Sequence, residues 1–461
     1  MVVFQSLFDK CYFRIRIILN KPHIIVRLSL VFLIVSLLGS YFSNGAEIKM
    51  VELDSWYQFR GPARNGICRE TGLLKQWKAD GPPLLWTVTN IGNGYSAPIF
   101  INNRFFITGD VDDDLVIFAF DFDGKLLWKT TNGLSWKGPY PGSRASCTYS
   151  DGRLYHYNAN GRLGCFSAVD GRELWALNVL EKFGGKGITW GLAECVLVDE
   201  NCVYVTAGGK QGLMAALNKT NGTVVWLSEP LILGESKLPE HERVSEPQGE
   251  VDSASYSSPI MFTIDKKKFI AGCSLRHIYV IDADAGKLIC TRAFPNRFQV
   301  IASMPVLVND TIFFTAPDSG GGVLYKIETN GVLSKKLWTT PLDTCHGGVI
   351  ALNRTLYGSY YRGRTGWVAV SLQDGSVRFH LKTLPMGSVL YADGRLYCLS
   401  QEGDMALISP ASDKLEIVSQ FRLINERKSD VWTHPVIYNK RLYLRYHNRL
   451  FCYDIADNSI N

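Results

Sequence analysis

Paired cysteines are absent from this sequence of 461 residues, because none of its 11 cysteines stands in a CC, CxxC or CxxCH arrangement. This absence excludes the simple thiol-redox and haem-attachment motifs. Several cysteines take places where other repeats of the chain have apolar residues, so we interpret most of them as small buried hydrophobic side chains. An oxidising compartment would allow a disulfide between Cys195 and Cys202, but the pairing does not follow from sequence.

The sequence also lacks an apolar run of about 20 residues, the length that a membrane-spanning helix needs. The apolar run LSLVFLIVSLL covers only residues 28–38, and small and polar residues follow it. This order is typical of an export signal. We predict a signal peptide or N-terminal signal anchor over residues 1–46, an export to the periplasm or cell envelope, and membrane contact only through this segment if it stays attached. Five basic residues precede the run, namely Lys10, Arg14, Arg16, Lys21 and Arg27.

A strong charge of one sign is missing as well. Residues 1–45 hold five of the 49 basic and one of the 43 acidic side chains, so the remainder carries a net charge of +2. A basic surface of the kind that binds nucleic acid is therefore not expected. The composition, with 46% hydrophobic and 20% charged residues, is that of an ordinary globular protein.

What the sequence does contain is one repeated pattern. A turn that resembles DGRLY occurs eight times, at intervals of about 40 to 65 residues, and a short apolar run stands on each side of it. Asn, Asp and Gly tolerate the positive φ of tight turns, so each pair of runs is predicted to form a hairpin. The turns begin at Asn102, Asp151, Glu200, Lys266, Asn309, Asn353, Asp393 and Asn439.

Each hairpin is followed by a third apolar run, a glycine turn and a fourth run that often ends in tryptophan, as in DFDGKLLW at residues 121–128. No amphipathic helix pattern lies between the units, which disfavours a parallel βαβ fold. Four-stranded antiparallel units at this period are propeller blades. We interpret the repeated tryptophans as blade-packing residues: Trp86, Trp128, Trp175, Trp226 and Trp338.

The predicted fold is therefore all-β, an eight-bladed propeller. The last unit reaches the chain end with only three strands, whereas PPLLWTV at residues 82–88 precedes the first unit without partners of its own. We predict that residues 84–88 complete the last blade and close the ring, which removes an exposed strand edge. The predicted divisions are residues 1–46 for the export segment, 47–83 for an N-terminal extension and 84–457 for the propeller.

The phrases AVDGRELW, SPIMF and DGRLY resemble the repeat of propellers of the pyrroloquinoline-quinone (PQQ) type, from about Trp56 to Ile455. This repeat is found in quinoprotein alcohol dehydrogenases and in the propeller subunit of the outer-membrane β-barrel assembly machinery. Longer stretches such as WYQFRGPARNGICRETGLLKQW and WTHPVIYNKRLYLR resemble exported bacterial PQQ-like propellers, some of them labelled polyvinyl-alcohol dehydrogenase-like. The resemblance implies the fold strongly and a reaction only weakly.

Candidate ligand-binding residues come from the propeller geometry. The first strand of each blade lines the channel, so the residues just before it converge at one mouth. Glu194 is a candidate calcium ligand or proton acceptor, and Arg144 a contact for a carboxylate or a quinone oxygen. Either histidine is a candidate base or anion contact, and Trp190 and Trp432 are candidate stacking platforms for a planar ligand. The alternative is that each polar group fills the channel and bonds to backbone or water. The full candidate set is Arg144, Trp190, Glu194, Ser257, Ser258, His346, Ser388, Trp432 and His434.

Three hypotheses for function follow. The first is a monomeric envelope scaffold, without chemistry of its own, that binds an envelope protein, a polymer or a small-molecule ligand at its channel mouth and loops. The second is a PQQ- and calcium-dependent quinoprotein dehydrogenase that oxidises alcohol groups, although the vicinal disulfide that the resemblance implies for such enzymes has no counterpart here. The third, a glycan-binding propeller, rests on the richness in aromatic residues.

Overall fold

The computed structural model describes residues 55–234, 247–318, 320–411 and 414–458. The predicted export segment lies outside these residues, so its prediction is not tested. In the described ranges, no helix has both the length and the apolar character required to cross a membrane. The unit from Ser55 to Asn461 is described below.

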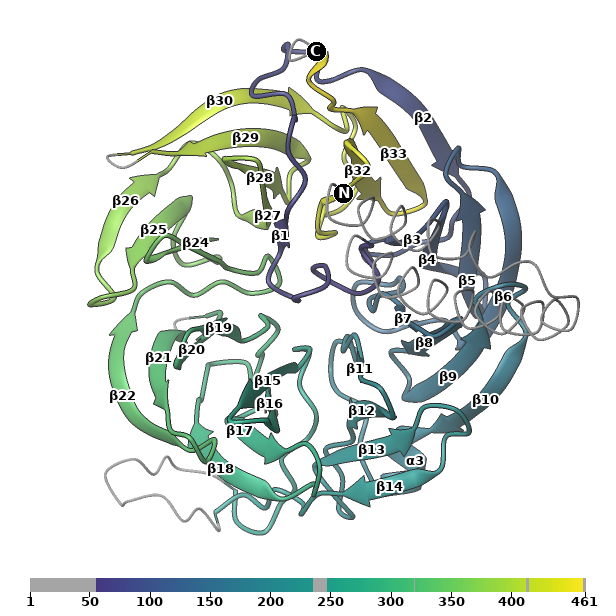
Figure 1. Cartoon of the computed structure of the whole chain (residues 1–461), viewed down its shortest axis with the longest axis vertical. Coiled ribbons are helices and arrows are strands. Elements are labelled where there is room, and N and C mark those ends of the chain that lie inside the picture. Colours follow the sequence, from purple (N-terminus) through teal and green to yellow (C-terminus); the bar gives the residue numbers. More distant parts are fainter. Residues whose placement is uncertain (1–54, 235–246, 319, 412–413, 459–461) are drawn as a thin grey trace, which may run out of the picture. The chain divides into compact units, whose positions relative to one another are not determined.

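Eight sheets of antiparallel strands surround a common centre (Figure 1). Blade 1 contains β3 (Ile99–Ile101), β4 (Arg104–Val111), β5 (Asp114–Asp121) and β6 (Leu126–Leu134). Blade 2 contains β7 (Thr148–Ser150), β8 (Arg153–Tyr157), β9 (Arg162–Ser167) and β10 (Glu173–Asn178). Blade 3 contains β11 (Leu197–Val198), β12 (Cys202–Thr206), β13 (Met214–Asn218) and β14 (Val224–Leu227). Blade 4 contains β15 (Ile260–Ile264), β16 (Lys267–Cys273), β17 (His277–Asp282) and β18 (Leu288–Ala293).

The second half of the ring repeats this order. Blade 5 contains β19 (Val306–Val308), β20 (Thr311–Ala316), β21 (Gly321–Ile327) and β22 (Leu333–Thr340). Blade 6 contains β23 (Ile350–Leu352), β24 (Thr355–Ser359), β25 (Trp367–Ser371) and β26 (Val377–Leu381). Blade 7 contains β27 (Gly387–Ala392), β28 (Arg395–Ser400), β29 (Asp404–Pro410) and β30 (Leu415–Arg422). The one helix in the described residues, α3 (Val179–Phe183), follows β10.

Blade 8 is closed as predicted. Its last three strands, β31 (Val436–Tyr438), β32 (Arg441–Tyr446) and β33 (Arg449–Asp454), are joined by β2 (Leu84–Thr89) from the beginning of the ring. Trp86 lies opposite Cys452 in the antiparallel β2–β33 pair. The eight-bladed all-β fold and its closure by an N-terminal strand are confirmed.

The predicted hairpin turns have the backbone that their residues favour. Seven of the eight carry a non-glycine residue with positive φ, such as Asn102 at 51° and Asp393 at 45°. Blade 3 differs, because its turn is held instead by the Asp199 carboxylate, which accepts hydrogen bonds from the backbone N–H groups of Asn201 and Cys202. Short polar side chains tolerate both arrangements, which explains why the turn motif varies without a change of fold.

The repeated tryptophans pack between blades. A Cβ atom added to Gly171 in blade 2 would lie 2.5 Å from the Trp128 ring of blade 1, and one added to Gly222 in blade 3 would lie 2.7 Å from Trp175 of blade 2. Gly286 and Gly375 meet Trp226 and Trp338 in the same way. In these four blades the glycine turn therefore seats the tryptophan of the preceding blade, and its lack of a side chain permits this approach.

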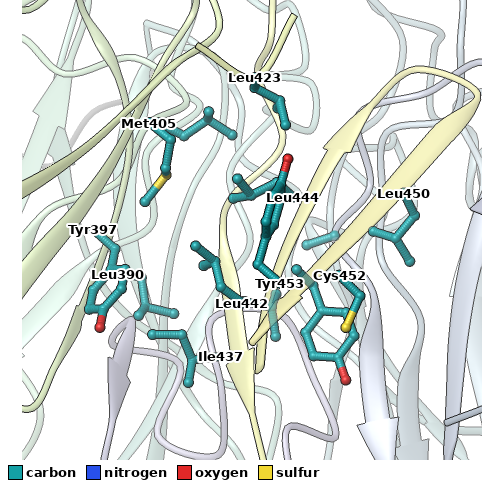
Figure 2. Close-up of a cluster of buried hydrophobic side chains, with 14 of the residues drawn as sticks. Leu390, Tyr397, Met405, Leu423, Ile437, Leu442, Leu444, Leu450, Cys452 and Tyr453 are labelled. Carbon is teal, nitrogen blue, oxygen red and sulfur yellow. The ribbon is translucent and has the colours of Figure 1, made fainter. Parts of the chain in front are cut away.

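The ten described cysteines are free thiols, nine of them buried, and Cys290 is partly exposed. This confirms their interpretation as buried hydrophobic side chains for most positions. Cys195 and Cys202 form no disulfide with each other in the structure. The thiols pack in apolar clusters, as Cys452 of blade 8 does in a cluster that also contains residues of blades 1 and 7 (Figure 2).

One feature of the fold was not predicted, a segment at residues 56–68 that crosses the middle of the ring (Figure 1). We call it the central segment. It ends in β1 (Ile67–Cys68), which pairs in parallel with β27, the inner strand of blade 7. Its carbonyls also accept hydrogen bonds from the inner strands of blades 1 and 2, since Phe100 N donates to Trp56 O and Tyr149 N donates to Tyr57 O, each at 2.9 Å.

Two buried arginines of the central segment reach further blades. Arg64 donates to the carbonyls of Cys195 and Val196 in front of blade 3, at 2.6 and 3.2 Å. Arg60 donates to the carbonyl of Val349 in front of blade 6, at 2.8 Å. Arg60 also lies 3.3 Å from His434 Nδ1, in front of blade 8. The central segment is thus bonded to six blades directly, and the channel of the propeller is filled at this level by the chain itself.

Candidate functional site

A cavity of about 310 Å³ opens at the channel mouth, and we call it the central pocket. The segments that precede the inner strands of seven blades line it, and Phe59 of the central segment adds to its wall. Because the inner strands run toward the same centre, residues distant in sequence meet here. The convergence expected from propeller geometry is present.

Six of the nine candidate residues line the central pocket: Arg144, Trp190, Ser258, His346, Trp432 and His434. The other three lie outside its lining and are buried. Ser257 donates to the carbonyl of Ser303 at 2.9 Å, and Ser388 donates to the carbonyl of Trp432 at 3.2 Å. Both carboxylate oxygens of Glu194 accept from the backbone N–H of Thr206 at 3.2 Å.

Ten of the nineteen residues that line the pocket carry an aromatic ring. On one side Trp190 packs against Tyr256, with ring centroids 5.8 Å apart. On the other side Trp432 contacts Tyr140 at 4.8 Å, Tyr95 at 5.1 Å and His346 at 4.7 Å. Such walls suit a ligand with a flat or ring-shaped part, because aromatic faces pack against rings over a large area.

Arg144 lies between the two aromatic groups, and its described hydrogen bonds all go to backbone carbonyls. It donates to Trp190 O at 2.7 Å, to Tyr140 O at 2.8 Å, to Pro139 O at 2.9 Å and to Gly142 O at 2.5 Å. Burial lowers the pKa of its guanidinium to about 10, so it still carries its charge near neutral pH. In this structure Arg144 holds the loop around Tyr140 in place.

The two histidines of the pocket are neutral near pH 7. Burial, and then the neighbouring Arg60, lower the pKa of His434 to about 3, and burial lowers that of His346 to about 4. His434 Nε2 lies 2.8 Å from the carbonyl of His346, and its Nδ1 lies 3.3 Å from Arg60. Because a carbonyl only accepts and a guanidinium only donates, His434 carries its proton on Nε2.

Charged side chains are few at the pocket. Asp318 and Arg362 line it, and Arg362 donates to the Tyr140 hydroxyl at 3.3 Å. Among the described residues, no group of three or more His, Cys, Asp or Glu side chains is placed to hold a metal ion. Burial raises the pKa of Glu194 to about 7, but this carboxyl is turned to Thr206 rather than to the pocket.

A protein-family model described as "Outer membrane protein assembly factor BamB" matches residues 113–381. The chain belongs to this family. A search of curated proteins gives no match. Among solved structures, BamB from Moraxella catarrhalis is similar with a TM-score of 0.54 and 12% identity, over 81% of this chain and 97% of that chain.

Other members of the same architecture are also similar in fold. Quinohemoprotein alcohol dehydrogenase from Comamonas testosteroni has a TM-score of 0.58 and 12% identity, over 88% of this chain and 81% of that chain. Quinohemoprotein alcohol dehydrogenase ADHIIG from Pseudomonas putida has a TM-score of 0.60 and 13% identity over the same shares. At this identity the likeness shows the fold alone, so function has to be argued from the site.

Several lining residues were not predicted, above all Tyr95, Tyr140, Tyr256 and Arg362. A signal for two of them was present. In YSAPI and YSSPI, Tyr95 and Tyr256 stand three residues before the proline that leads into the inner strand, the place that Trp432 takes in WTHPV. Tyr140 and Arg362 come from loops between elements, and no repeat position marks them.

Proposed function

We propose that this propeller is a binding protein of the cell envelope, which holds a ring-containing ligand in the central pocket. The observation that carries the proposal is the pair of aromatic walls at Trp190 and Trp432, on either side of an arginine already bonded to backbone. A free small molecule, or a ring carried by a protein or polymer, would meet the same walls.

The envelope location is supported by the N-terminal order of basic, apolar and small residues, which is typical of export. The family description also refers to the outer membrane. We therefore propose an exported scaffold, with its pocket and loops as the binding surface and without a reaction of its own.

Fluorescence tests the binding proposal. 8-Anilinonaphthalene-1-sulfonate, a planar aromatic anion, is titrated into the purified protein. We expect saturable binding that Trp190→Ala and Trp432→Ala weaken about tenfold, because each removes a ring that packs on the probe. Leu174→Ala, on the exposed outer strand β10, is the matched control and keeps the affinity. Equal affinity in all four proteins would contradict a binding role for the pocket.

A second candidate, the quinoprotein dehydrogenase, is favoured by the similarity to quinohemoprotein alcohol dehydrogenases. The described pocket does not fit its calcium ion. Calcium takes six to eight oxygen ligands, with carboxylates prominent among them. Asp318 is the one carboxylate that lines the described pocket, and Glu194 is bonded to Thr206. The four carbonyl contacts of Arg144 also leave it poorly placed for a quinone carboxylate.

An activity assay separates the two candidates. The protein is incubated with PQQ and Ca²⁺, then with a primary alcohol and a dye that accepts electrons. We expect no dye reduction above the rate without protein. Alcohol-dependent reduction that requires both PQQ and Ca²⁺ would overturn the proposal of a binding protein without chemistry.

A further inference from the structure

A second hollow lies beside the central pocket, and we call it the rim groove. It has a volume of about 1100 Å³ and is bounded by the connection at residues 423–429, by the hairpin at 446–449 and by Asn93. Tyr95 and Tyr140 line both hollows. The two spaces therefore adjoin across these two tyrosines.

A continuous series of rings links the two hollows. His346 lies 6.3 Å from Tyr361 and 4.7 Å from Trp432, measured between ring centroids. Tyr95 lies 5.1 Å from Trp432 and 5.2 Å from His447, which lines the rim groove. Contacts at these distances form one aromatic track from the pocket into the groove.

Tyr140 stands at the junction in a costly conformation. Its φ is 54°, in the left-handed region that non-glycine residues seldom adopt, and 39% of its surface is exposed. Arg144 bonds to its carbonyl, Arg362 bonds to its hydroxyl, and its ring lies on Trp432. Strain that surrounding contacts maintain is typical of functional sites. Here the contacts of Tyr140 with Arg144, Arg362 and Trp432 hold its exposed ring between the two hollows.

The rim groove is preformed. The Tyr446 hydroxyl accepts hydrogen bonds from the backbone N–H groups of Lys428 and Ser429, at 2.8 and 3.3 Å, and so ties the 423–429 connection to the hairpin. Arg427 of this connection forms an ion pair at 2.6 Å with Asp430, the residue that follows the connection. A groove held in this way loses little conformational entropy when a ligand binds.

The lining of the groove combines aromatic rings with amide and charged side chains. Asn93, Asn425 and Asn448 offer amides, and Glu426 and Lys428 offer one charge of each sign. The described lining residues come from connections and a hairpin turn, apart from Tyr446 of β32 and from Arg449 and Phe451 of β33. Both strands are paired on their two sides, β33 by β2 and β32, and β32 by β33 and β31. No free strand edge is therefore available in this lining for an added peptide strand.

A linear glycan matches this combination. A sugar ring has a face of C–H groups that packs on an aromatic ring, and an edge of hydroxyl groups that both donate to and accept from amides and carboxylates. We propose that a linear glycan chain binds across both hollows, with one sugar ring in the central pocket and the following units over Tyr140 and along the rim groove. This inference rests on the proposed binding function and adds the class of ligand.

An array of linear oligosaccharides of one to eight units tests the inference. The array includes β-1,4-linked glucose, N-acetylglucosamine and mannose and α-1,4-linked glucose, and the series that binds is then titrated by calorimetry. We expect the affinity to rise at least about tenfold from the disaccharide to the hexasaccharide, because further units gain contacts in the groove.

Variants test how much each hollow contributes to glycan binding. Asn425→Ala combined with Asn448→Ala, two exposed groove residues, should remove the gain with length and leave disaccharide binding unchanged. Tyr140→Ala should weaken hexasaccharide binding about tenfold, whereas Tyr140→Phe keeps the ring and most of the affinity. Arg69→Ala, exposed and outside both linings, is the control.

Other results would overturn the inference in distinguishable ways. Aromatic-probe binding at the central pocket without binding of any glycan, or glycan binding that does not depend on length, leaves the proposed function standing and removes the extended glycan. Binding of members of a random decapeptide library, with no glycan bound, would assign the groove to a peptide. No binding of the probe, the glycans or the peptides would remove the proposed function as well.

Discussion

At the scale of single residues, the contact between a tryptophan and a glycine of the next blade is the unit that the chain repeats. The indole N–H adds a hydrogen bond in several copies, for example from Trp175 to Lys219 O at 3.0 Å and from Trp226 to Ala283 O at 2.9 Å. One aromatic ring thus connects two blades by packing and by a directed polar contact, which explains why the pattern recurs through much of the chain.

Gly171→Ala tests this packing. Gly171 has a φ of 75°, and an added Cβ would lie 2.5 Å from the Trp128 ring. The matched control is Gly152→Ala in the same blade, where φ is 76° and an added Cβ would meet nothing within 4 Å. The control should lose about 1 to 2 kcal/mol for its left-handed backbone. Gly171→Ala should lose about 1 to 3 kcal/mol more, because the ring must shift. Urea unfolding measures both, and equal losses would contradict the packing role.

Glu194→Gln is the second residue-scale prediction. Burial raises the pKa of Glu194 from its ordinary 4.5 to about 7, so the folded protein binds this proton more tightly than the unfolded chain does. The carboxyl therefore favours folding fully below about pH 4.5, and this contribution is lost as the pH rises to about 7. Glutamine has no charge to bury and can still accept from Thr206 N.

The variant should accordingly be more stable than the native protein at pH 8, by up to about 3 kcal/mol, and show a much smaller difference at pH 5. Urea unfolding at the two pH values measures this difference. Glu200→Gln, an exposed residue of the same blade, should change the free energy of unfolding at neither pH. A Glu194→Gln protein that is less stable at pH 8 would show that the carboxylate is needed in its charged form.

At the scale of elements, the central segment is the main addition to the repeated blades. It has no strand partner along most of its length, and it is held by side chains that reach outward and by carbonyls that accept from the inner strands. It also supplies Phe59 to the central pocket, where the ring meets His434 at 4.9 Å. The pocket is therefore built partly by an element outside the blades.

Arg64→Lys tests how strongly this element is tied. The Arg64 guanidinium donates to Cys195 O, to Val196 O and to Gln58 Oε1, at 2.6, 3.2 and 3.1 Å. A lysine ammonium cannot reproduce this fork, so buried carbonyls lose their partner and we expect a loss of about 2 to 4 kcal/mol. Arg69→Lys, at an exposed position just after the central segment, should stay within about 0.5 kcal/mol of the native protein. Similar stability of the two variants in thermal unfolding would contradict this role.

At the scale of the whole molecule, closure depends on a strand that is distant in sequence from its partner. β2 belongs to the beginning of the ring and pairs with β33 at its end. The last blade is therefore complete only when both ends of the propeller chain lie side by side. A large buried apolar cluster beside β2 contains residues of blades 1, 7 and 8 (Figure 2). Closure and the burial of this cluster are therefore linked.

Three chains separate the closing strand from the central segment. A chain that begins at Ser55 keeps both, one that begins at Pro82 keeps β2 alone, and one that begins at Tyr95 has neither. We expect melting temperatures to fall in that order, with the larger step on the loss of β2, because that loss exposes the whole edge of β33. Differential scanning calorimetry measures the series. The same melting temperature for the Tyr95 and Ser55 chains would contradict closure by β2.

The response of the molecule to acid follows from its buried histidines. Burial lowers the pKa of His156, His346 and His447 to about 4 and that of His434 to about 3, from an ordinary value of 6.5. The unfolded chain therefore binds more protons than the folded one between these values. Each such histidine lowers the free energy of unfolding by up to about 1.4 kcal/mol per pH unit as the pH falls below about 6.

Four histidines outweigh the opposite effect of Glu194 in this range, so stability should decrease from pH 6.5 to pH 4. Urea unfolding at half-unit steps measures the slope. His156→Gln removes one of the four groups, so the slope of unfolding free energy against pH should fall by the contribution of one histidine, up to about 1.4 kcal/mol per pH unit. An unchanged slope would contradict the assignment.

Much of the fold could be predicted because it depends on short-range chemistry. Asn102 and Asp393 indicate turns, apolar runs indicate strands, and the tryptophan repeated in several fourth strands indicates packing. The expectation that residues just before each inner strand converge at one mouth also predicted Arg144, His346 and Trp432 at the pocket. The central segment was beyond such reasoning, since Arg60 and Arg64 belong to no repeat and bond to carbonyls that the fold alone brings near.

By itself, the sequence determined the number of blades, the hairpins and the strand that closes the ring, because each follows from residues within one repeat or from one unpaired strand. Only the tertiary structure decided how side chains are arranged in the channel and pocket that those repeats surround. It placed Arg144 against carbonyls rather than in open space, turned Glu194 toward Thr206, and put Tyr140 over the passage between two hollows. The reason is physical: a local pattern determines which backbone forms, whereas the direction and partners of a side chain depend on residues that arrive from other blades.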